Sequence, residues 1–251
     1  EGREELDICL FGGVVYQTDQ SEKEIWKYLD GTRTEVEEIS KSAQEQEVEF
    51  QLYLGENASE DFFKRMDSTQ SPKVIHLATH GFFYVSPEEL ELNDQEETGD
   101  LAFRSGGRGV SAFVNNPNPL MRSGLALAGA NEVWSSSDFS GEDGVVTAYE
   151  VSNMRLDNTD LVVLSACETG LGDIRGSEGV YGLQRAFKIA GVDKLVMSLW
   201  QVPDKETSEF MISFYSNLFR LKDVRKSFEL TQAEMRKKYD PYYWAAFVLV
   251  E

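Results

Sequence analysis

Two short apolar runs each end in a residue that could do nucleophilic chemistry. The run that begins at Val74 ends in His80 and Gly81, and the run that begins at Leu161 ends in Cys167. A free thiol has a pKa of about 8.5, so only a few per cent of it is thiolate at neutral pH. A nearby imidazole can take the thiol proton and later deliver it to a leaving amine. The pair therefore predicts a cysteine nucleophile, Cys167, with His80 as its general base.

Backbone groups beside this pair could stabilise a negative charge on a substrate oxygen. Gly81 has no side chain, so a substrate carbonyl can approach the backbone closely there. The N–H groups of Gly81 and Cys167 could together form an oxyanion hole, in which each donor is typically worth a few kcal/mol. Both residues are therefore candidates for that role.

The other histidine and the other cysteine are expected to be structural. Cys9 lies inside an apolar run and is interpreted as a small core residue. His76 precedes His80 by four residues and is expected to share its strand face but to lie deeper. The chain has only two histidines and lacks the paired Cys and His spacings of a zinc site. We therefore expect no metal and no cofactor.

The glycines after Cys167 suggest an alternative, which is nucleotide binding. Gly170, Gly172 and Gly176 follow a predicted strand and precede a predicted helix, as in a dinucleotide-binding fingerprint. The spacing is wrong by one residue, and no acidic residue ends the next strand where a ribose would need it. This alternative is much less supported than the thiol chemistry.

Strands and helices alternate along most of the chain. This order implies right-handed crossovers and a largely parallel sheet with helices on both faces. Ligands bind such sheets beyond the carboxyl ends of the strands, so His80 and Cys167 would meet there if their strands were neighbours. Strands are predicted at 5–16, 48–54, 73–79, 160–166, 194–200 and 243–250. Helices are predicted at 33–46, 59–66, 120–127, 145–153, 177–190, 204–220 and 223–238.

The pattern weakens between residues 84 and 140. Residues 87–100 are strongly acidic, and the run Asn-Asn-Pro-Asn-Pro at 115–119 excludes regular structure. We expect a mobile acidic loop at about 84–118. Two interpretations stay open: a disordered insertion, or an activation segment that becomes ordered when a sensor or substrate binds.

Length, charge and cysteine usage limit the class of protein. A length of 251 residues suits one large α/β domain, at 1–251, and the start without Met favours a fragment of a longer protein. The net charge of −20 disfavours direct contact with nucleic acid or an anionic membrane. The longest apolar runs are too short to span a bilayer. Two cysteines form no disulfide framework, which favours a reducing, cytoplasmic location.

An ordered set of motifs resembles the CHAT family, caspase-like peptidases of clan CD that are often joined to tetratricopeptide repeats (TPR). The resemblance covers nearly the whole chain. It lies in VIHLATHGFF (74–83), PLMRSGLALAGAN (119–131), GEDGVVTAYEVSNM (141–154), DLVVLSACETGLGDIRGSEGVYGLQRAFKIAGVDKLVMSLWQVPD (160–204) and PYYWAAFVLV (241–250).

The resemblance implies a caspase-hemoglobinase fold, a three-layer α/β/α sandwich around a roughly six-stranded, mostly parallel sheet. It also implies a His/Cys dyad, matched here by His80 and Cys167. The expected activity is cleavage of a protein substrate in bacterial signalling or defence, gated by a fused or associated sensor such as a TPR region. The alternative is a catalytically silent caspase-like interaction domain, which the presence of both dyad residues disfavours.

The resemblance also bears on which substrate side chain precedes the cut bond, the P1 residue. In basic-specific members of the clan, an acidic residue two positions before the catalytic cysteine helps to hold P1. Here that position is Ser165, and a buried cationic P1 without a paired charge would be costly. We therefore expect an uncharged P1, with Trp200 and Gln201 lining the subsites. Asp204, or an acidic residue from the loop at about 84–118, could overturn this expectation, because the fold can bring residues distant in sequence into the pocket.

Overall fold

The computed structural model describes residues 6–17, 25–68, 71–83, 116–135, 142–165 and 178–251. Its frame is a six-stranded sheet with the strand order β2-β1-β3-β7-β8-β9. Every neighbouring pair is parallel except β8 and β9, which are antiparallel. The strands are β1 (Asp7–Val14), β2 (Glu49–Gly55), β3 (Val74–Leu77), β7 (Leu161–Leu164), β8 (Lys194–Ser198) and β9 (Phe247–Val250).

The central strands β3 and β7 are direct neighbours. Val74 pairs with Leu161, and the register continues to Leu77 opposite Leu164. Because the pair is parallel, both strands end at the same edge of the sheet. The strand that precedes His80 therefore lies beside the strand that precedes Cys167.

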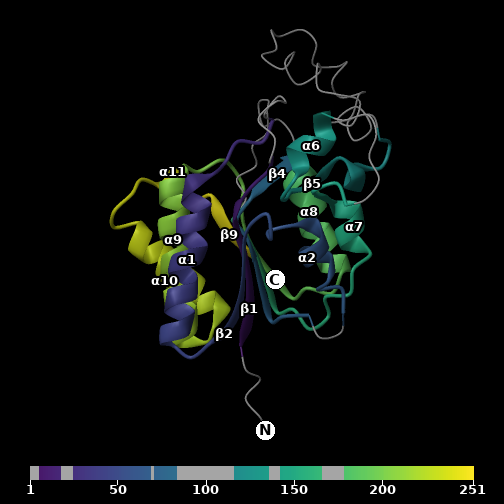
Figure 1. Ribbon diagram of the computed structural model, residues 1–251. Helices are drawn as coiled ribbons and strands as arrows, with labels where there is room; N and C mark the ends of the chain where they lie inside the picture. Colours follow the sequence, from purple (N-terminus) through teal and green to yellow (C-terminus); the bar gives the residue numbers. More distant parts are fainter. Residues whose placement is uncertain (1–5, 18–24, 69–70, 84–115, 136–141, 166–177) are drawn as a thin grey trace.

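Helices cover both faces of this sheet (Figure 1). One face packs against α1 (Asp30–Glu45), α9 (Asp204–Leu221) and α10 (Val224–Met235). The other face packs against α2 (Glu60–Lys64), α7 (Ala148–Ser152) and α8 (Glu178–Ile189). The three-layer α/β/α fold with a mostly parallel six-stranded sheet is confirmed.

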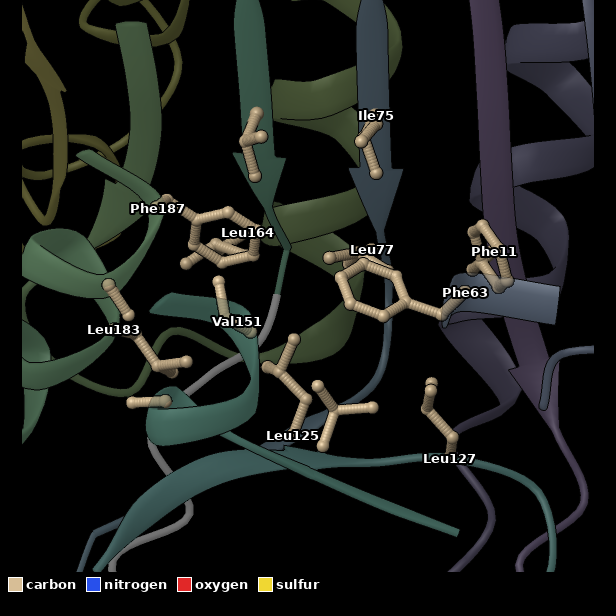
Figure 2. Close-up of a cluster of buried hydrophobic side chains, with 14 of the residues drawn as sticks. Phe11, Phe63, Ile75, Leu77, Leu125, Leu127, Val151, Leu164, Leu183 and Phe187 are labelled. Carbon is tan, nitrogen blue, oxygen red and sulfur yellow. The ribbon is translucent and has the colours of Figure 1, made fainter. Parts of the chain in front are cut away.

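Side-chain alternation explains why the sheet is buried on both faces. In β3, Ile75 and Leu77 join the cluster on the α8 face, whereas Val74 joins the cluster on the α9 face. Figure 2 shows the α8-face cluster, to which β7 contributes Leu164, α8 contributes Phe187 and β5 contributes Leu125. Strands buried on both faces read as continuous apolar runs, which is how the sequence revealed them.

A second, three-stranded antiparallel sheet lies beyond the end of β3. It consists of β4 (His80–Phe83), β5 (Ser123–Ala126) and β6 (Val145–Thr147) in that order. The predicted helix at 120–127 is therefore wrong: a short 3₁₀ turn, η1 (Pro119–Met121), leads into β5. A side chain at Gly124 would place its Cβ 2.5 Å from the backbone oxygen of Val146, so the glycine permits this close pairing.

Other elements also differ from the prediction. The predicted helix at 145–153 begins as β6, and α7 starts only after Thr147, whose side chain forms a capping box with Glu150. The predicted strand at 243–250 begins with the helical turn α11 (Pro241–Trp244), because Pro241 suits a first helical position. The helix α6 (Ala130–Ser135) was not predicted. Within the described residues, no helix is long and apolar enough to cross a membrane.

Candidate functional site

His80 is the first residue of β4 and lies just past the carboxyl end of β3. The predicted strand at 73–79 ends at Leu77, and the amide of Ala78 then donates to the carbonyl of Phe11 at 2.8 Å. Thr79 Oγ1 lies 2.9 Å from the Tyr16 hydroxyl and also donates to the carbonyl of Ala126. These bonds fix the step by which the chain leaves the main sheet and enters the second one.

A backbone carbonyl sets the tautomer of His80. Its Nε2 lies 2.7 Å from the carbonyl oxygen of Lys27. Because a carbonyl only accepts hydrogen bonds, Nε2 carries the proton, and in the neutral ring the lone pair is then on Nδ1. The side chain of Lys27 plays no part in this hydrogen bond. Lys27 therefore acts through its backbone, which no sequence pattern could have indicated.

Aromatic rings surround the imidazole. The ring centroids of Tyr16 and Trp26 lie 5.1 Å and 5.3 Å from that of His80, which is only 5% exposed. Burial lowers the pKa of His80, while the Lys27 carbonyl and the charge of Asp204 act in the opposite direction. The net lowering favours a neutral ring at neutral pH, which is the form that can accept a proton.

Asn131 holds the segment that contacts His80. Its Oδ1 accepts hydrogen bonds from the amides of Ile25 and Trp26, at 3.1 Å and 2.8 Å. Its Nδ2 donates to the carbonyl of Trp26 at 2.9 Å, and the residue is fully buried. This residue was missed by sequence reasoning, although it is the last residue of the motif at 119–131. Asn131 positions the backbone that in turn positions His80.

A narrow pocket of about 40 Å³ contains His80 and three of the four residues proposed from the sequence to contact substrate. Ser165, Gln201 and Asp204 line it, whereas Trp200 does not. The indole Nε1 of Trp200 instead donates to the carbonyl of Tyr242 at 2.9 Å. The described lining residues are Leu29, Thr32, Glu35, His80, Ser165, Gln201, Asp204 and Thr207.

The structure describes only one of the two candidate oxyanion-hole residues. Gly81 is buried in β4 opposite Leu125 and is not among the residues that line the pocket. Cys167 lies outside the described residues, of which Ser165 is the last before it. Of the predicted dyad, the structure therefore describes His80, and of the segment that leads to Cys167 it describes β7 and Ser165.

His76 lies on the face of β3 that packs against α1 and α9, and it is more deeply buried than His80, as expected. Its ring is fully buried against Tyr215 of α9, with a centroid distance of 5.3 Å, and its Nε2 lies 2.8 Å from Glu35 Oε1. The two histidines do not lie in one strand as predicted, because β3 ends at Leu77 and His80 begins β4 of the second sheet. Glu35, which contacts His76, also lines the His80 pocket.

The remaining candidate groups are inert in this structure. Cys9 is a buried free thiol, and burial raises its pKa to about 12, with a further contribution from Asp7. Such a thiol is rarely ionised at neutral pH.

A larger hollow of about 550 Å³ lies where β1 and β2 begin, and it shares no residue with the His80 pocket. In the part of the chain that the structure describes, no group of three or more His, Cys, Asp or Glu side chains could hold a metal ion.

Comparison with known proteins shows the family to which this chain belongs. The chain is 28% identical over 191 residues to tetratricopeptide repeat protein 28 of Mus musculus, and 32% identical over 191 residues to the Homo sapiens protein of that name. Each match covers 74% of this chain but only 7% of the relative, so the chain spans a small part of those proteins. The family model described as the CHAT domain matches residues 8–251. The chain therefore belongs to the CHAT domain family, whose relatives are caspase-like peptidases.

Proposed function

We propose that this chain is a cysteine endopeptidase, a thiol protease that cuts a protein substrate with Cys167 as nucleophile and His80 as general base. The observation that carries the proposal is the state of His80. Its Nε2 proton is held by the Lys27 carbonyl, and its ring is buried and biased toward the neutral form. Ser165, two residues before Cys167 in sequence, lines the same pocket.

The reaction follows from these roles. Nδ1 of His80 accepts the thiol proton of Cys167, and the thiolate attacks the substrate carbonyl carbon. The N–H groups of Gly81 and Cys167 are proposed to stabilise the oxyanion that forms. His80 then gives the proton to the leaving amine, and a water molecule, activated by the same imidazole, hydrolyses the thioester.

A TPR region is proposed to accompany this domain and to gate it. Support comes from the names of the relatives and from the small share of their length that the chain matches. An associated sensor and a role in signalling or defence stay predictions from the family resemblance.

The decisive experiment compares N-terminal proteomics of a lysate treated with the chain and with its Cys167→Ala and His80→Ala variants. We expect new protein N-termini that disappear with either variant, because loss of a nucleophile or its base typically lowers turnover by several orders of magnitude. Cys9→Ala is the matched control, because it removes the other thiol, and it should leave the cleavage products unchanged.

Two outcomes would contradict the proposal. Cleavage that persists in Cys167→Ala would rule out this nucleophile. No cleavage by the folded chain, alone or joined to a TPR region, would favour the catalytically silent interaction domain.

A further inference from the structure

The His80 pocket carries negative charge from two carboxylates that come from different helices. Glu35 lies in α1 and is only 1% exposed, whereas Asp204 is the first residue of α9 and is exposed. None of the described residues that line the pocket is Lys or Arg. Glu35 therefore supplies a buried carboxylate to the pocket, and Asp204 supplies an exposed one.

The start of α1 meets the start of α9 at this point, and the contact is close. A Cβ built on Gly31 would lie 3.0 Å from the Cβ of Asp204, so the absence of a side chain there lets the two helices approach. Asp30 acts on Asp204 as a further negative charge, since its Coulombic effect raises the Asp204 pKa. Acids in the first turn of a helix commonly offset the positive end of the helix dipole.

The carboxylates exceed what the helix dipoles require. Each helix N-terminus contributes only about half a positive charge. Two carboxylates in the pocket, with Asp30 nearby, therefore leave a negative excess even if the buried His76 beside Glu35 carries a positive charge. Glu35 in addition lies beyond the first turn of α1, where the effect of the dipole has faded.

Two buried polar atoms in the pocket make no hydrogen bond within the part of the chain that the structure describes. Among the described residues, neither Glu35 Oε1 nor Ser165 Oγ has a hydrogen-bond partner. His76 Nε2 approaches Glu35 Oε1 to 2.8 Å, but the contact lacks hydrogen-bond geometry. Both residues are more than nine-tenths buried, and a buried polar group without a partner typically costs about 1–3 kcal/mol. A ligand with several donors would remove that cost.

The size of the pocket restricts which ligand can supply these donors. One water molecule needs about 10–15 Å³ of comparable space. A pocket of about 40 Å³ therefore accepts a slender chain rather than an aromatic ring. The side chains of Lys and Arg are slender, cationic and rich in donors.

We propose that Glu35 and Asp204 select a basic P1 residue, Lys or Arg, with Ser165 accepting a further hydrogen bond from its cationic end. The inference rests on the proposed peptidase function and names its substrate class. It replaces the uncharged P1 that the neutral Ser165 favours when only the sequence is considered, because Glu35 supplies a buried carboxylate from a different part of the chain.

The test uses peptides that differ only at P1. Arginine is compared with citrulline, its neutral isostere, and lysine with norleucine. We expect kcat/KM to favour the basic member of each pair by about tenfold or more, as the loss of a charged hydrogen bond would give. Asp204→Asn and Glu35→Gln should each reduce this preference. Glu206→Gln is the matched control, because Glu206 lies in the first turn of α9 but does not line the pocket, and it should leave the preference unchanged.

The two variants also protect the test against misfolding. Glu35 is buried beside His76, whereas Asp204 is exposed, so Asp204→Asn should fold even if Glu35→Gln does not. Equal cleavage of arginine and citrulline peptides, with dependence on Cys167, would overturn this inference and leave the peptidase intact.

Direct binding judges the pocket separately from catalysis. Isothermal titration of the Cys167→Ala chain with the same uncleaved peptides should show tighter binding of arginine than of citrulline, and Asp204→Asn should remove the difference. That result supports the pocket even if no peptide is cut, in which case only the proposed function fails. Binding without a preference for the basic peptide overturns the inference.

Discussion

The imidazole of His80 shows how a buried backbone can prepare a side chain for proton transfer. The Lys27 carbonyl at 2.7 Å selects the tautomer, and burial between Tyr16 and Trp26 lowers the pKa. The nearby charge of Asp204 partly offsets that lowering. The ring is thus held in one orientation and kept mostly neutral at neutral pH.

This balance predicts the pH dependence of catalysis. The acid limb of kcat/KM should have an apparent pKa below the ordinary histidine value of about 6.5, because burial disfavours the protonated ring. Asp204→Asn removes the charge that raises the His80 pKa, so the limb should move to still lower pH. A citrulline peptide serves as substrate, so that changes in P1 binding do not contribute. A limb that moves to higher pH in Asp204→Asn would contradict this account.

The roles of Lys27 and Glu35 at the site could not have been predicted from the sequence, and the reasons differ for the two residues. The role of Lys27 belongs to its backbone oxygen, which every residue type has. Glu35 lies in a helix that reads as charged and amphipathic, and only the packing of α1 against α9 shows that this acid faces inward. His80 and Ser165, in contrast, stand at the ends of apolar runs, where the topology of a parallel sheet places ligands.

At the scale of elements, the small sheet β4-β5-β6 positions His80 from one side. Its register sets His80 opposite Ala126 and Gly81 opposite Leu125. Gly124 lies in the middle of β5, where an added Cβ would meet the Val146 carbonyl at 2.5 Å and the Phe82 ring at 2.7 Å. The first of these contacts is with backbone, and the second is with the ring of Phe82, two residues after His80.

We expect Gly124→Ala to lower the free energy of unfolding by about 1–3 kcal/mol, the usual cost of overpacking. Urea unfolding measures the effect. Ser123→Ala in the same strand is the control, because the buried Ser123 Oγ has no hydrogen-bond partner among the described residues and its loss should cost little. A Gly124→Ala chain as stable as the Ser123→Ala chain would show that β5 can shift to make room.

The elements of the main sheet could be predicted because their patterns are local. Apolar runs marked β1, β3, β7 and β8, and the alternation with helices implied the parallel order. The segment 120–127 failed for the opposite reason: its apolar residues suit a helix, and only pairing with β4 and β6 makes it a strand. The same long-range pairing turns the first residues of the predicted helix at 145–153 into β6.

At the scale of the whole molecule, a cluster of one lysine and three glutamates connects α2 with the chain around β6 and α7. Lys64 Nζ in α2 lies 2.5 Å from Glu60, 2.7 Å from Glu142 and 2.9 Å from Glu150. Glu60 Oε2 accepts a hydrogen bond from the amide of Gly144 at 2.9 Å. The cluster therefore ties α2 to the segment that leads into β6 and α7.

This cluster predicts how global stability responds to pH. Burial, followed by the hydrogen bond with Glu142, raises the Glu60 pKa from 4.5 to about 8. A raised carboxyl pKa means that the folded state binds the proton more tightly than the unfolded state. The stabilisation that proton binding by Glu60 gives the folded state is therefore full below pH 4.5 and is lost as pH rises to about 8. The raised pKa of Asp143 acts in the same direction, whereas the lowered pKa of Glu142 acts against it.

Unfolding of the Glu60→Gln variant measures the effect, because glutamine keeps the neutral form at every pH. We expect the free energy of unfolding of the parent chain to fall between these two pKa values, and that fall to be smaller in the variant. Glu56→Gln, at an exposed position close in sequence, is the control and should keep the parent slope. An identical slope in Glu60→Gln would show that Glu60 is ionised in the folded chain.

The pairing of Phe83 with Ser123 has a consequence for chain entropy. Because these residues are direct partners in the sheet, the intervening stretch begins and ends at adjacent positions. The entropic cost of closing a loop grows only with the logarithm of its length, about 0.6 kcal/mol for each doubling. A flexible insertion between Phe83 and Ser123 that doubles the length of this stretch should therefore change the folding free energy by only about 0.6 kcal/mol, and the frame around His80 should stay intact.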